Sequence, residues 1–401
     1  MNKAYKLSEA ILFNPVERLT KGMHCKKVPM ECLCPFTRHI SSYEDNAVYT
    51  GGSKFRNGDT LLARITPCLE NGKTAKVNFL NDNEVAFGST EFIVLRAKPD
   101  VTDENFIYYL AISPEFRKIA IKSMVGSSGR QRVQQNVLEN IIFEIPELSK
   151  QKKIGKILSL LDDKIELNTK INQNLEAQAQ AIFKSWFVDF EPFQNGKFVD
   201  SELGPIPEGW QVVPLDQIAD FLNGLPMQKY RPVSNEIGLP VLKIKELREG
   251  ICSEDSERCT EDIKPEYIVD DGDVIFSWSG SLMIDIWTGG RCGLNQHLFK
   301  VTSKDYEKWF YYLWICHHME NFIAIAADKA TTMGHIQRGH IHAALTLVPS
   351  KQVYNELSSI LSPIINKLIQ SRIESQRLAK LRDNLLPKLM SGEIDVSEIE
   401  V

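Results

Sequence analysis

Two long stretches of the chain carry apolar residues at intervals of seven positions. In the first stretch the two rows are Ile154, Leu161, Asn168, Leu175 and Ile182, and Leu158, Ile165, Asn172, Ala179 and Trp186. In the second stretch they are Leu357, Ile364, Ser371, Leu378 and Leu385, and Leu361, Leu368, Ser375, Arg382 and Leu389. This spacing predicts two long helices that pair along an apolar seam, as in a coiled coil.

Polar residues interrupt the seam at matching places in both helices. If the helices run antiparallel, Asn168 lies near Ser375 and Asn172 near Ser371, so the polar side chains meet one another and not leucine. Such a layer would select the register and orientation of the pair. The alternative is that the stripe drifts around an ordinary 3.6-residue helix and these four side chains face water.

Prolines interrupt the second stretch. Pro363 predicts a kink or a fresh helix start after Ser362, and Pro387 predicts the end of the helix. Proline lacks the backbone N–H, and its ring clashes with the preceding turn.

The segments in front of the two helices share short strand patterns. NGDTLLARI at Asn57 to Ile65 resembles DGDVIFSWS at Asp271 to Ser279, and each is a glycine turn followed by an apolar run. FGSTEFIVLRA from Phe87 resembles CGLNQHLFKVT from Cys292. Each half of the chain therefore has a mixed α/β front part and a helical tail.

An offset of 203 residues aligns 104–186 with 307–389 without a gap. The alignment contains 13 identical pairs. Their members in the first half are Glu104, Tyr108, Tyr109, Leu110, Ile112, Gln134, Pro146, Ile157, Leu158, Ser159, Lys164, Gln173 and Leu175. We therefore predict an α/β (α+β) tandem duplication with pseudo-two-fold symmetry, in which two domains are separated by two long antiparallel helices. The expected boundaries are 1–147 for the first domain, 148–190 for the central helix, 191–206 for a linker, 207–349 for the second domain, and 350–401 for the last helix and tail.

Composition and charge narrow the class of protein. The chain has 401 residues, 43% hydrophobic and 25% charged, as in ordinary globular proteins with more than one core. No membrane span or secretory signal is recognisable, so we expect a cytoplasmic protein that does not bind membranes. Residues 1–148 carry 19 basic and 17 acidic side chains, net +2, whereas residues 207–349 carry 13 and 20, net −7.

No catalytic or metal centre is expected from the sequence. The chain lacks the GxxxxGK[ST] phosphate loop and the [DNS]PP[YFW] and FxGxG motifs of adenine methyltransferases. Its cysteines show no CxxC spacing, and its loose histidines lack a second ligand cluster. A nuclease-like set, Asp189, Glu191 and Lys197, falls at the start of the expected linker and just before it.

Several stretches resemble the specificity subunits of type I restriction-modification systems. They are FKSWFVDFEPF at Phe183 to Phe193, LGPIPEGWQVVPL at Leu203 to Leu215, the helix starts at Pro146 and Pro349, and LLPKLMSGEI at Leu385 to Ile394. The resemblance covers nearly the whole chain. It implies two target recognition domains that read the halves of a split, asymmetric double-stranded DNA sequence, with helical spacers that fix the gap.

The same resemblance implies partners. Members of the family bind two copies of a methyltransferase subunit, which carries S-adenosylmethionine and methylates adenine, and restriction (motor and nuclease) subunits that use ATP and Mg²⁺. No cofactor is expected in this chain.

A helix of about 37 residues spans roughly 55 Å, which exceeds the 34 to 36 Å or so of one B-DNA turn.

Base and phosphate contacts need polar or basic side chains on exposed loops. The first candidate stretch is GSSGRQRV at Gly126 to Val133, and its repeat partner is KATTMGHIQR at Lys329 to Arg338. The expected DNA-binding residues are Ser127, Ser128, Arg130, Gln131, Arg132, Thr331, Thr332, His335, Gln337 and Arg338, followed by Arg64, Thr66, Asn71, Lys73, Ser277 and Ser279, with Trp278 between the last two.

Two other classes of function stay open at this point. One is a coiled-coil scaffold whose α/β domains bind protein or small ligands, and the other is a self-sufficient nuclease. The acidic second domain also predicts that the chain alone binds DNA weakly, because phosphate contacts depend on basic side chains.

Overall fold

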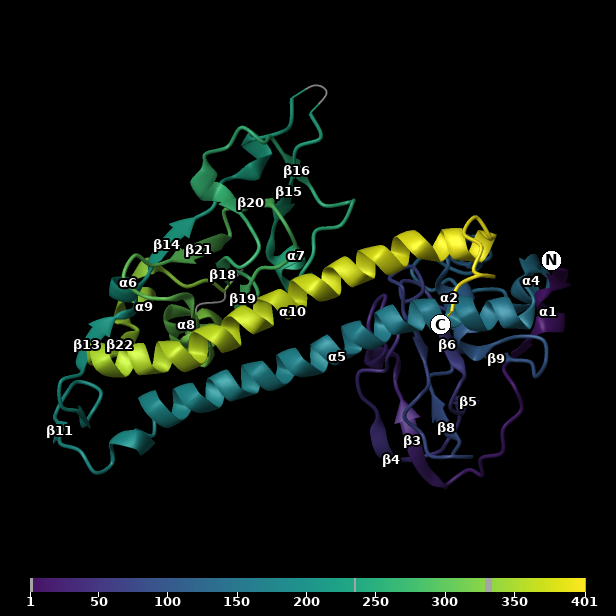
Figure 1. Cartoon of the computed structure of the whole chain (residues 1–401), viewed down its shortest axis with the longest axis horizontal. Helices are drawn as coiled ribbons and strands as arrows, with labels where there is room; N and C mark the ends of the chain where they lie inside the picture. The colour runs from purple at the N-terminus through teal and green to yellow at the C-terminus, as the bar shows by residue number, and fades with distance from the viewer. Residues whose placement is uncertain (1–2, 234–235, 329–333, 401) are drawn as a thin grey trace. The chain divides into compact units, whose positions relative to one another are not determined.

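The computed structural model describes residues 3–233, 236–328 and 334–400. The chain divides into two compact units (Figure 1). The first unit is Met1–Glu166 together with Arg377–Val401, and the second is Leu167–Gln376. Each unit therefore contains one α/β domain and parts of both long helices.

Two four-stranded sheets and one strand pair build the first unit. One sheet has the order β2 (Ile11–Phe13), β9 (Phe92–Ala97), β6 (Thr60–Ala63) and β7 (Thr74–Lys76). The other has the order β4 (Glu44–Val48), β3 (His24–Val28), β8 (Ala86–Gly88) and β5 (Ser53–Phe55), and β1 (Lys3–Lys6) pairs with β10 (Ile142–Ile145). All of these pairings are antiparallel except that of β3 with β8.

Capping residues set the helices beside these sheets. The helical segments are α1 (Leu7–Ala10), η1 (Met30–Cys32), α2 (Glu104–Ile112), α3 (Pro114–Lys122) and α4 (Gln135–Asn140). The Asp103 carboxylate accepts hydrogen bonds from the first amides of α2, and Ser113 caps α3 with Pro114 at its first position. The helix α2 is almost wholly buried, and Tyr108 and Tyr109 belong to the core.

The second unit repeats this topology strand for strand. One sheet has the order β14 (Asp220–Asn223), β21 (Leu298–Thr302), β18 (Val274–Ser277) and β19 (Met283–Ile286). The other has the order β16 (Arg258–Cys259), β15 (Leu239–Leu242), β20 (Cys292–Leu294) and β17 (Ile268–Val269), and β13 (Gln211–Pro214) pairs with β22 (Leu345–Val348). The single parallel pairing recurs between β15 and β20. The predicted duplication and its mixed α/β class are confirmed.

The second unit differs in its main helix and its entry segment. Its helical segments are η2 (Glu191–Phe193), α6 (Leu215–Ile218), η3 (Met227–Lys229), α7 (Ile244–Glu249), η4 (Pro265–Tyr267), α8 (Lys308–Asp328) and α9 (Arg338–Ala343), and a short hairpin joins β11 (Phe198–Val199) to β12 (Ile206–Pro207). The helix α8 is continuous where α2 and α3 are separate, since His317 stands at the repeat position of Pro114 and leaves the backbone hydrogen bond intact.

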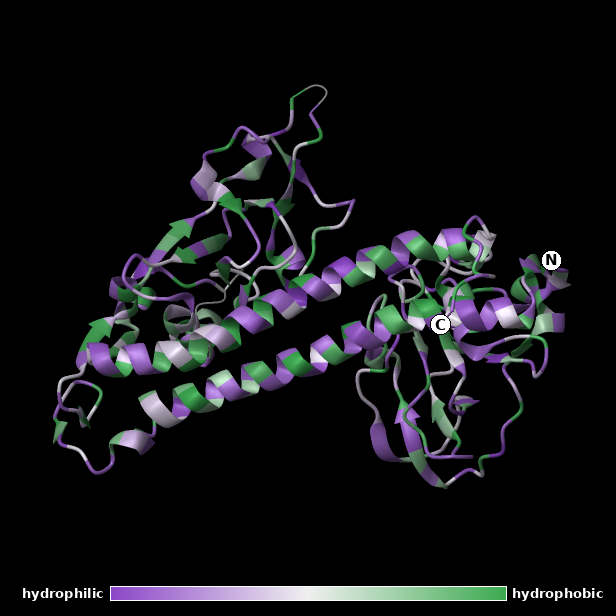
Figure 2. Ribbon diagram, viewed as in Figure 1, coloured by the Kyte–Doolittle hydropathy of each residue, from purple (hydrophilic) through white to green (hydrophobic). Residues whose placement is uncertain are grey.

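The two predicted long helices are α5 (Leu148–Phe187) and α10 (Lys351–Ser391). Within the first unit Lys150 contacts Asp395 and Asp162 contacts Arg382, so partner numbers fall as positions on α5 rise. Within the second unit Asn168 contacts Ser375 and Glu176 contacts Arg372, so partner numbers fall there as well. The helices are therefore antiparallel in both units, and apolar and polar residues alternate along each (Figure 2).

The predicted fresh helix start after Ser362 and the predicted helix end at Pro387 are wrong, whereas the alternative of a kink at Pro363 stays a prediction. The helix α10 runs without interruption through Pro363 and Pro387 and ends at Ser391. A proline inside a helix costs about 3 kcal/mol, but buried neighbours such as Leu361 and Leu389 keep the helix packed on the core. The end comes at Gly392, whose φ of +78° is a left-handed conformation that glycine adopts without strain.

Candidate nucleic-acid interface

Two predicted loops of the first unit lie side by side. The amide of Thr66 donates to the Gln131 carbonyl at 3.0 Å, and the amide of Val133 donates to the Arg64 carbonyl at 2.8 Å. Ile65 also forms a bridge with Arg132. The structure thus brings together two candidate stretches that are more than 60 positions apart in the sequence, and we call segments 64–73 and 125–133 the first loop pair.

The tip of segment 125–133 is a tight, exposed turn. Val125 and Arg132 exchange backbone hydrogen bonds of 3.0 and 2.9 Å, and the Arg130 amide donates to the Ser127 carbonyl. Gly126 and Gly129 have φ of +141° and +77°, which only glycine adopts readily. The turn therefore leaves Ser127, Ser128 and Arg130 exposed at its tip, with Gln131 half-buried behind them.

Four predicted residues of the first unit already have intramolecular partners. Arg132 forms a bidentate ion pair with Glu91, with bonds of 2.7 to 3.0 Å, and this hydrogen bonding raises the pKa of Arg132. Arg64 donates to the Val133 carbonyl, Lys73 to the Met30 carbonyl, and Thr66 to the Glu70 carboxylate. Arg64 and Lys73 hold the loops in place, whereas Asn71 is exposed.

The second unit places equivalent segments together. The Gly280 amide donates to the Gly334 carbonyl and the Ile336 amide to the Trp278 carbonyl, both at 3.0 Å, and Ser279 bridges His335. Segments 277–280 and 334–338 form the second loop pair. Duplication has therefore produced the same backbone arrangement twice, with different side chains.

The expectation that Ser277 and Ser279 are exposed needs correction. Ser277 is fully buried and donates to the Ser279 carbonyl at 3.2 Å, while Ser279 is 6% exposed and lies 3.0 Å from the His297 ring nitrogen. Ser277 is the last residue of β18, all four residues of which are buried. Both serines therefore lie beneath the surface of the loop, and their contact with DNA stays a prediction.

Other polar and aromatic groups lie at the surface of the second loop pair. Trp278 is half-buried, and its Nε1 donates to Asn223 Oδ1 at 3.0 Å. Its ring lies 6.1 Å from that of His297 and 6.4 Å from that of His335. Asn223 and His297 were not predicted, and no pattern in the sequence separates Trp278 from its two serine neighbours, because all four residues of β18 are buried.

The remaining predictions of the second unit have mixed outcomes. His335, Gln337 and Arg338 are exposed. Arg338 donates to the Phe221 carbonyl at 3.2 Å and lies 5.8 Å above the Phe299 ring. Thr331 and Thr332 lie outside the described residues.

The four polar residues of the seam are all buried or half-buried. Asn168 is 1% exposed and its amide donates to Ser375 Oγ at 3.2 Å and to Glu374 Oε2 at 2.9 Å. Asn172 Oδ1 and Ser371 Oγ are buried, and in the described part of the chain neither has a hydrogen-bond partner. The structure therefore places Asn168 against Ser375 and turns all four side chains away from bulk water.

Two absences bear on the possible chemistry. Among residues 3–233, 236–328 and 334–400, no three His, Cys, Asp or Glu side chains gather as a metal site. In the same ranges, no helix is both long and apolar enough to cross a membrane.

The protein is built from two α/β domains of the same topology, and each domain carries a loop pair with the same backbone hydrogen bonds. The family described as "Type I restriction modification DNA specificity domain" matches residues 27–177 and 207–381. The chain belongs to this family. It is a non-catalytic, DNA-recognising component of a type I restriction-modification system.

Named relatives agree with this assignment. The chain is 28% identical over 304 residues to the type I restriction enzyme MjaIX specificity subunit of Methanocaldococcus jannaschii, covering 74% of this chain and 70% of the relative. It is 24% identical over 405 residues to the HindI specificity subunit of Haemophilus influenzae, covering 84% and 87%. The crystal structure of a type I S subunit from M. genitalium has the same fold, with a TM-score of 0.53, 14% identity, and 97% and 96% of the two chains covered.

Proposed function

We propose that the chain reads a bipartite, asymmetric DNA target, one half with each α/β domain. The observation that carries this proposal is the equivalence of the two loop pairs in backbone hydrogen bonding. Their side chains differ, with Arg130 and Gln131 in one and His335 and Gln337 in the other. Equivalent frames with different side chains would recognise two different sequences.

In this proposal the long helices act as spacers. Residues 1–147 and 207–349 are the recognition domains, 191–206 is a linker, and the helical segments 148–190 and 350–401 set the unread gap. The buried polar layer, in which Asn168 contacts Ser375, holds the register of the pair. A fixed register is needed because each additional base pair both displaces and rotates the second half-site.

The proposal also includes partners. A duplicated surface offers the same contacts twice, which favours two copies of a methyltransferase subunit. That subunit would supply S-adenosylmethionine for adenine methylation, and restriction subunits would supply ATP- and Mg²⁺-dependent translocation and cleavage. The complex would act in the cytoplasm.

Footprinting of the purified chain on DNA, with and without the methyltransferase subunit, tests this function. We expect two protected segments separated by an unprotected gap, seen when the methyltransferase is added. A single continuous protected segment would contradict the bipartite target. Metal-dependent cleavage by the chain alone would contradict the non-catalytic role.

A further inference from the structure

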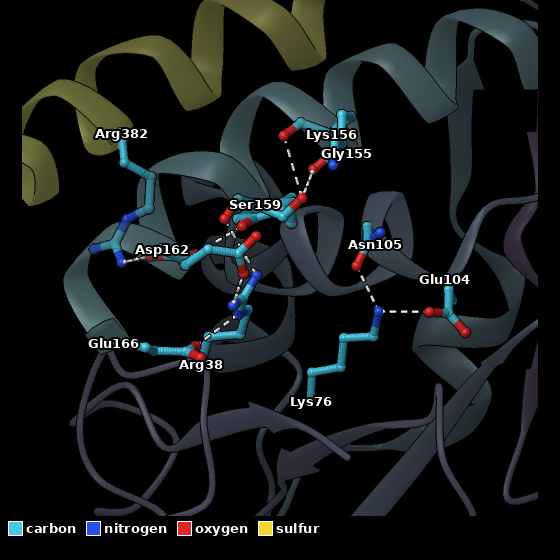
Figure 3. A network of polar contacts seen from close by, with 12 residues as sticks. Arg38, Lys76, Glu104, Asn105, Gly155, Lys156, Ser159, Asp162, Glu166 and Arg382 are labelled. Carbon is cyan, nitrogen blue, oxygen red and sulfur yellow. Dashed lines mark hydrogen bonds and ion pairs between the residues drawn. The ribbon is translucent and has the colours of Figure 1, made fainter. Parts of the chain in front are cut away.

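A buried arginine joins the first recognition domain to the spacer helix. Arg38 comes from the loop between η1 and β4, and it is only 7% exposed. Its Nε donates to Glu166 Oε1 at 2.8 Å, its Nη2 to Asp163, and its Nη1 to the Ser159 carbonyl at 3.5 Å (Figure 3). One side chain thus contacts two successive turns of α5.

The same loop holds the first loop pair. The Arg38 carbonyl accepts the Lys76 amide at 2.8 Å, and the Phe36 amide donates to the Gly72 carbonyl at 3.0 Å. Lys73 Nζ donates to the Met30 carbonyl just before this loop. Segment 64–73 therefore reaches α5 through a short series of hydrogen bonds that passes through the Arg38 loop.

A second link runs from β7, the strand that ends at Lys76, to the first turn of α2. Lys76 Nζ donates to Glu104 Oε1 at 2.7 Å and to Asn105 Oδ1 (Figure 3). Lys76 is 8% exposed, whereas the side chain of its partner Glu104 is 51% exposed. The strand β7 is therefore held by the Arg38 loop on one side and by α2 on the other. A displacement of Arg38 would also displace segment 64–73, because β7 is not free to move by itself.

Electrostatics keep the Arg38 contact in place. Burial alone lowers the pKa of the guanidinium, but hydrogen bonds to Glu166 and Asp163 outweigh burial and raise it. Arg38 therefore remains charged at every relevant pH. Its planar group also satisfies several acceptors at fixed angles, which a lysine ammonium does not.

We propose that Arg38 is a positioning residue that sets the orientation of the first loop pair on α5 and thereby determines which gap length the chain accepts. This inference rests on the proposed function. Arg38 itself would not contact DNA, because it is buried among carboxylates of the spacer.

The second unit has a different attachment. Arg372 on α10 donates to Asp285 Oδ1 at 2.6 Å, to the Ile286 carbonyl at 3.2 Å, and to Glu176 on α5. Here the helix supplies the arginine and the domain supplies the carboxylate, the reverse of the Arg38 arrangement. Since the repeat position of Arg372 is Thr169, the two attachments are not copies, and each can be altered without changing the other.

The test measures DNA binding across a series of gaps. The complex with the methyltransferase subunit is assembled with wild-type chain, Arg38→Met or Arg38→Lys. Its affinity is measured for duplexes that keep both wild-type half-sites and differ only in the number of base pairs between them. We expect Arg38→Met to reduce the preference for the wild-type gap over gaps one base pair shorter or longer by about tenfold. Arg38→Lys keeps the charge but not the planar, forked group, so its preference for the wild-type gap should lie between those of the wild type and Arg38→Met.

Arg96 provides a matched control. It lies on β9, is 12% exposed in its side chain, and forms ion pairs with Asp59 and Glu17 inside the recognition domain. Arg96→Met removes a buried, paired arginine without touching α5. It should weaken binding to all gaps in parallel and leave the preference among them unchanged.

The outcomes separate this inference from the proposed function. If the wild-type complex shows no preference for a split site, both are overturned. If the wild type prefers one gap and Arg38→Met and Arg38→Lys keep that preference, only the role of Arg38 is overturned. Should Arg38→Met fail to fold, the result for Arg38→Lys decides, and equal loss of preference in Arg96→Met would contradict a specific role for Arg38.

Discussion

Arg382 of α10 forms an ion pair with Asp162 of α5, with 2.7 Å between Nη1 and Oδ1 and side-chain exposures of 7% and 4%. The other oxygen of Asp162 accepts a hydrogen bond from the Tyr109 hydroxyl at 2.7 Å. Burial alone lowers the pKa of Arg382, but Asp162 and Asp383 outweigh it and raise the pKa. One carboxylate therefore ties both spacer helices to α2 of the first domain.

Breaking this pair should destabilise the first unit. Arg382→Met leaves the Asp162 carboxylate buried without its counter-ion, and removing one member of a buried pair costs about 3–5 kcal/mol. Urea unfolding followed by circular dichroism measures the change. Arg377→Met, an exposed arginine on the same helix, is the control and should cost less than about 0.5 kcal/mol. Equal effects of the two variants would contradict the structural role of the pair.

The antiparallel register can be tested by cross-linking. Cysteines placed by Asn168→Cys and Ser375→Cys should form an intramolecular disulfide under mild oxidation, because the two side chains lie in hydrogen-bond contact. Mass spectrometry identifies the linked peptides. Asn168→Cys combined with Gln370→Cys, at an exposed position of α10, should not cross-link. A comparable yield from both pairs would mean that the register is not fixed.

Arg130 should contribute to reading one half-site only. Its side chain is exposed at the tip of segment 125–133, and a lost base or phosphate contact costs about 1–3 kcal/mol. Affinity is measured for the methyltransferase complex on DNA mutated in either half-site. In the Arg130→Ala variant, mutating the first half-site should reduce the affinity less than it does in the wild type. Mutating the second half-site should reduce the affinity as much as in the wild type. Arg18→Ala, another exposed arginine of this unit, should change neither, and equal losses at both half-sites would argue against one domain per half-site.

Acid should destabilise the second unit through His318. Burial, assisted by His317, lowers the pKa of His318 from 6.5 to about 4, although the Leu345 carbonyl partly opposes this. Because the unfolded chain takes up the proton first, the stability present above pH 6.5 is lost as the pH falls toward 4, by about 2 kcal/mol between pH 7 and 5. His318→Gln keeps a donor for Leu345 and should reduce this loss in urea unfolding. An unchanged pH dependence would show that His318 is not responsible.

The isolated chain should bind DNA weakly and with a shallow salt dependence. Residues 207–349 carry 13 basic and 20 acidic side chains, net −7, so few counterions are released by this domain. Fluorescence anisotropy at several salt concentrations measures affinity and slope, with and without the methyltransferase subunit. Tight binding by the chain alone would contradict the proposal that the partners neutralise much of the phosphate charge.

The sequence predicted the duplication well because repeated residues report repeated topology. The identities at Tyr108, Tyr109 and Leu110 fall in a buried helix that both domains need for their cores. The heptad rows likewise located α5 and α10, since most positions of the seam on either side of the polar layer are apolar. These features depend on local patterns that one sequence carries in full.

Other features depended on tertiary packing that a local pattern does not contain. Pro363 and Pro387 stay within α10 because surrounding residues are buried in the core. Ser277 and Ser279 looked like exposed loop residues, but the packing of the second unit buries both. Nor did any pattern connect Arg38 with Glu166, which are 128 positions apart and meet only in the folded unit.

The central claim is that one chain selects two half-sites separated by a fixed gap. Sequencing that detects adenine methylation, in host cells with and without this chain, tests it most directly. We predict a split, asymmetric motif with one gap length that is methylated only when the chain is present. Methylation that is unchanged by loss of the chain, or a motif without a gap, would contradict the account.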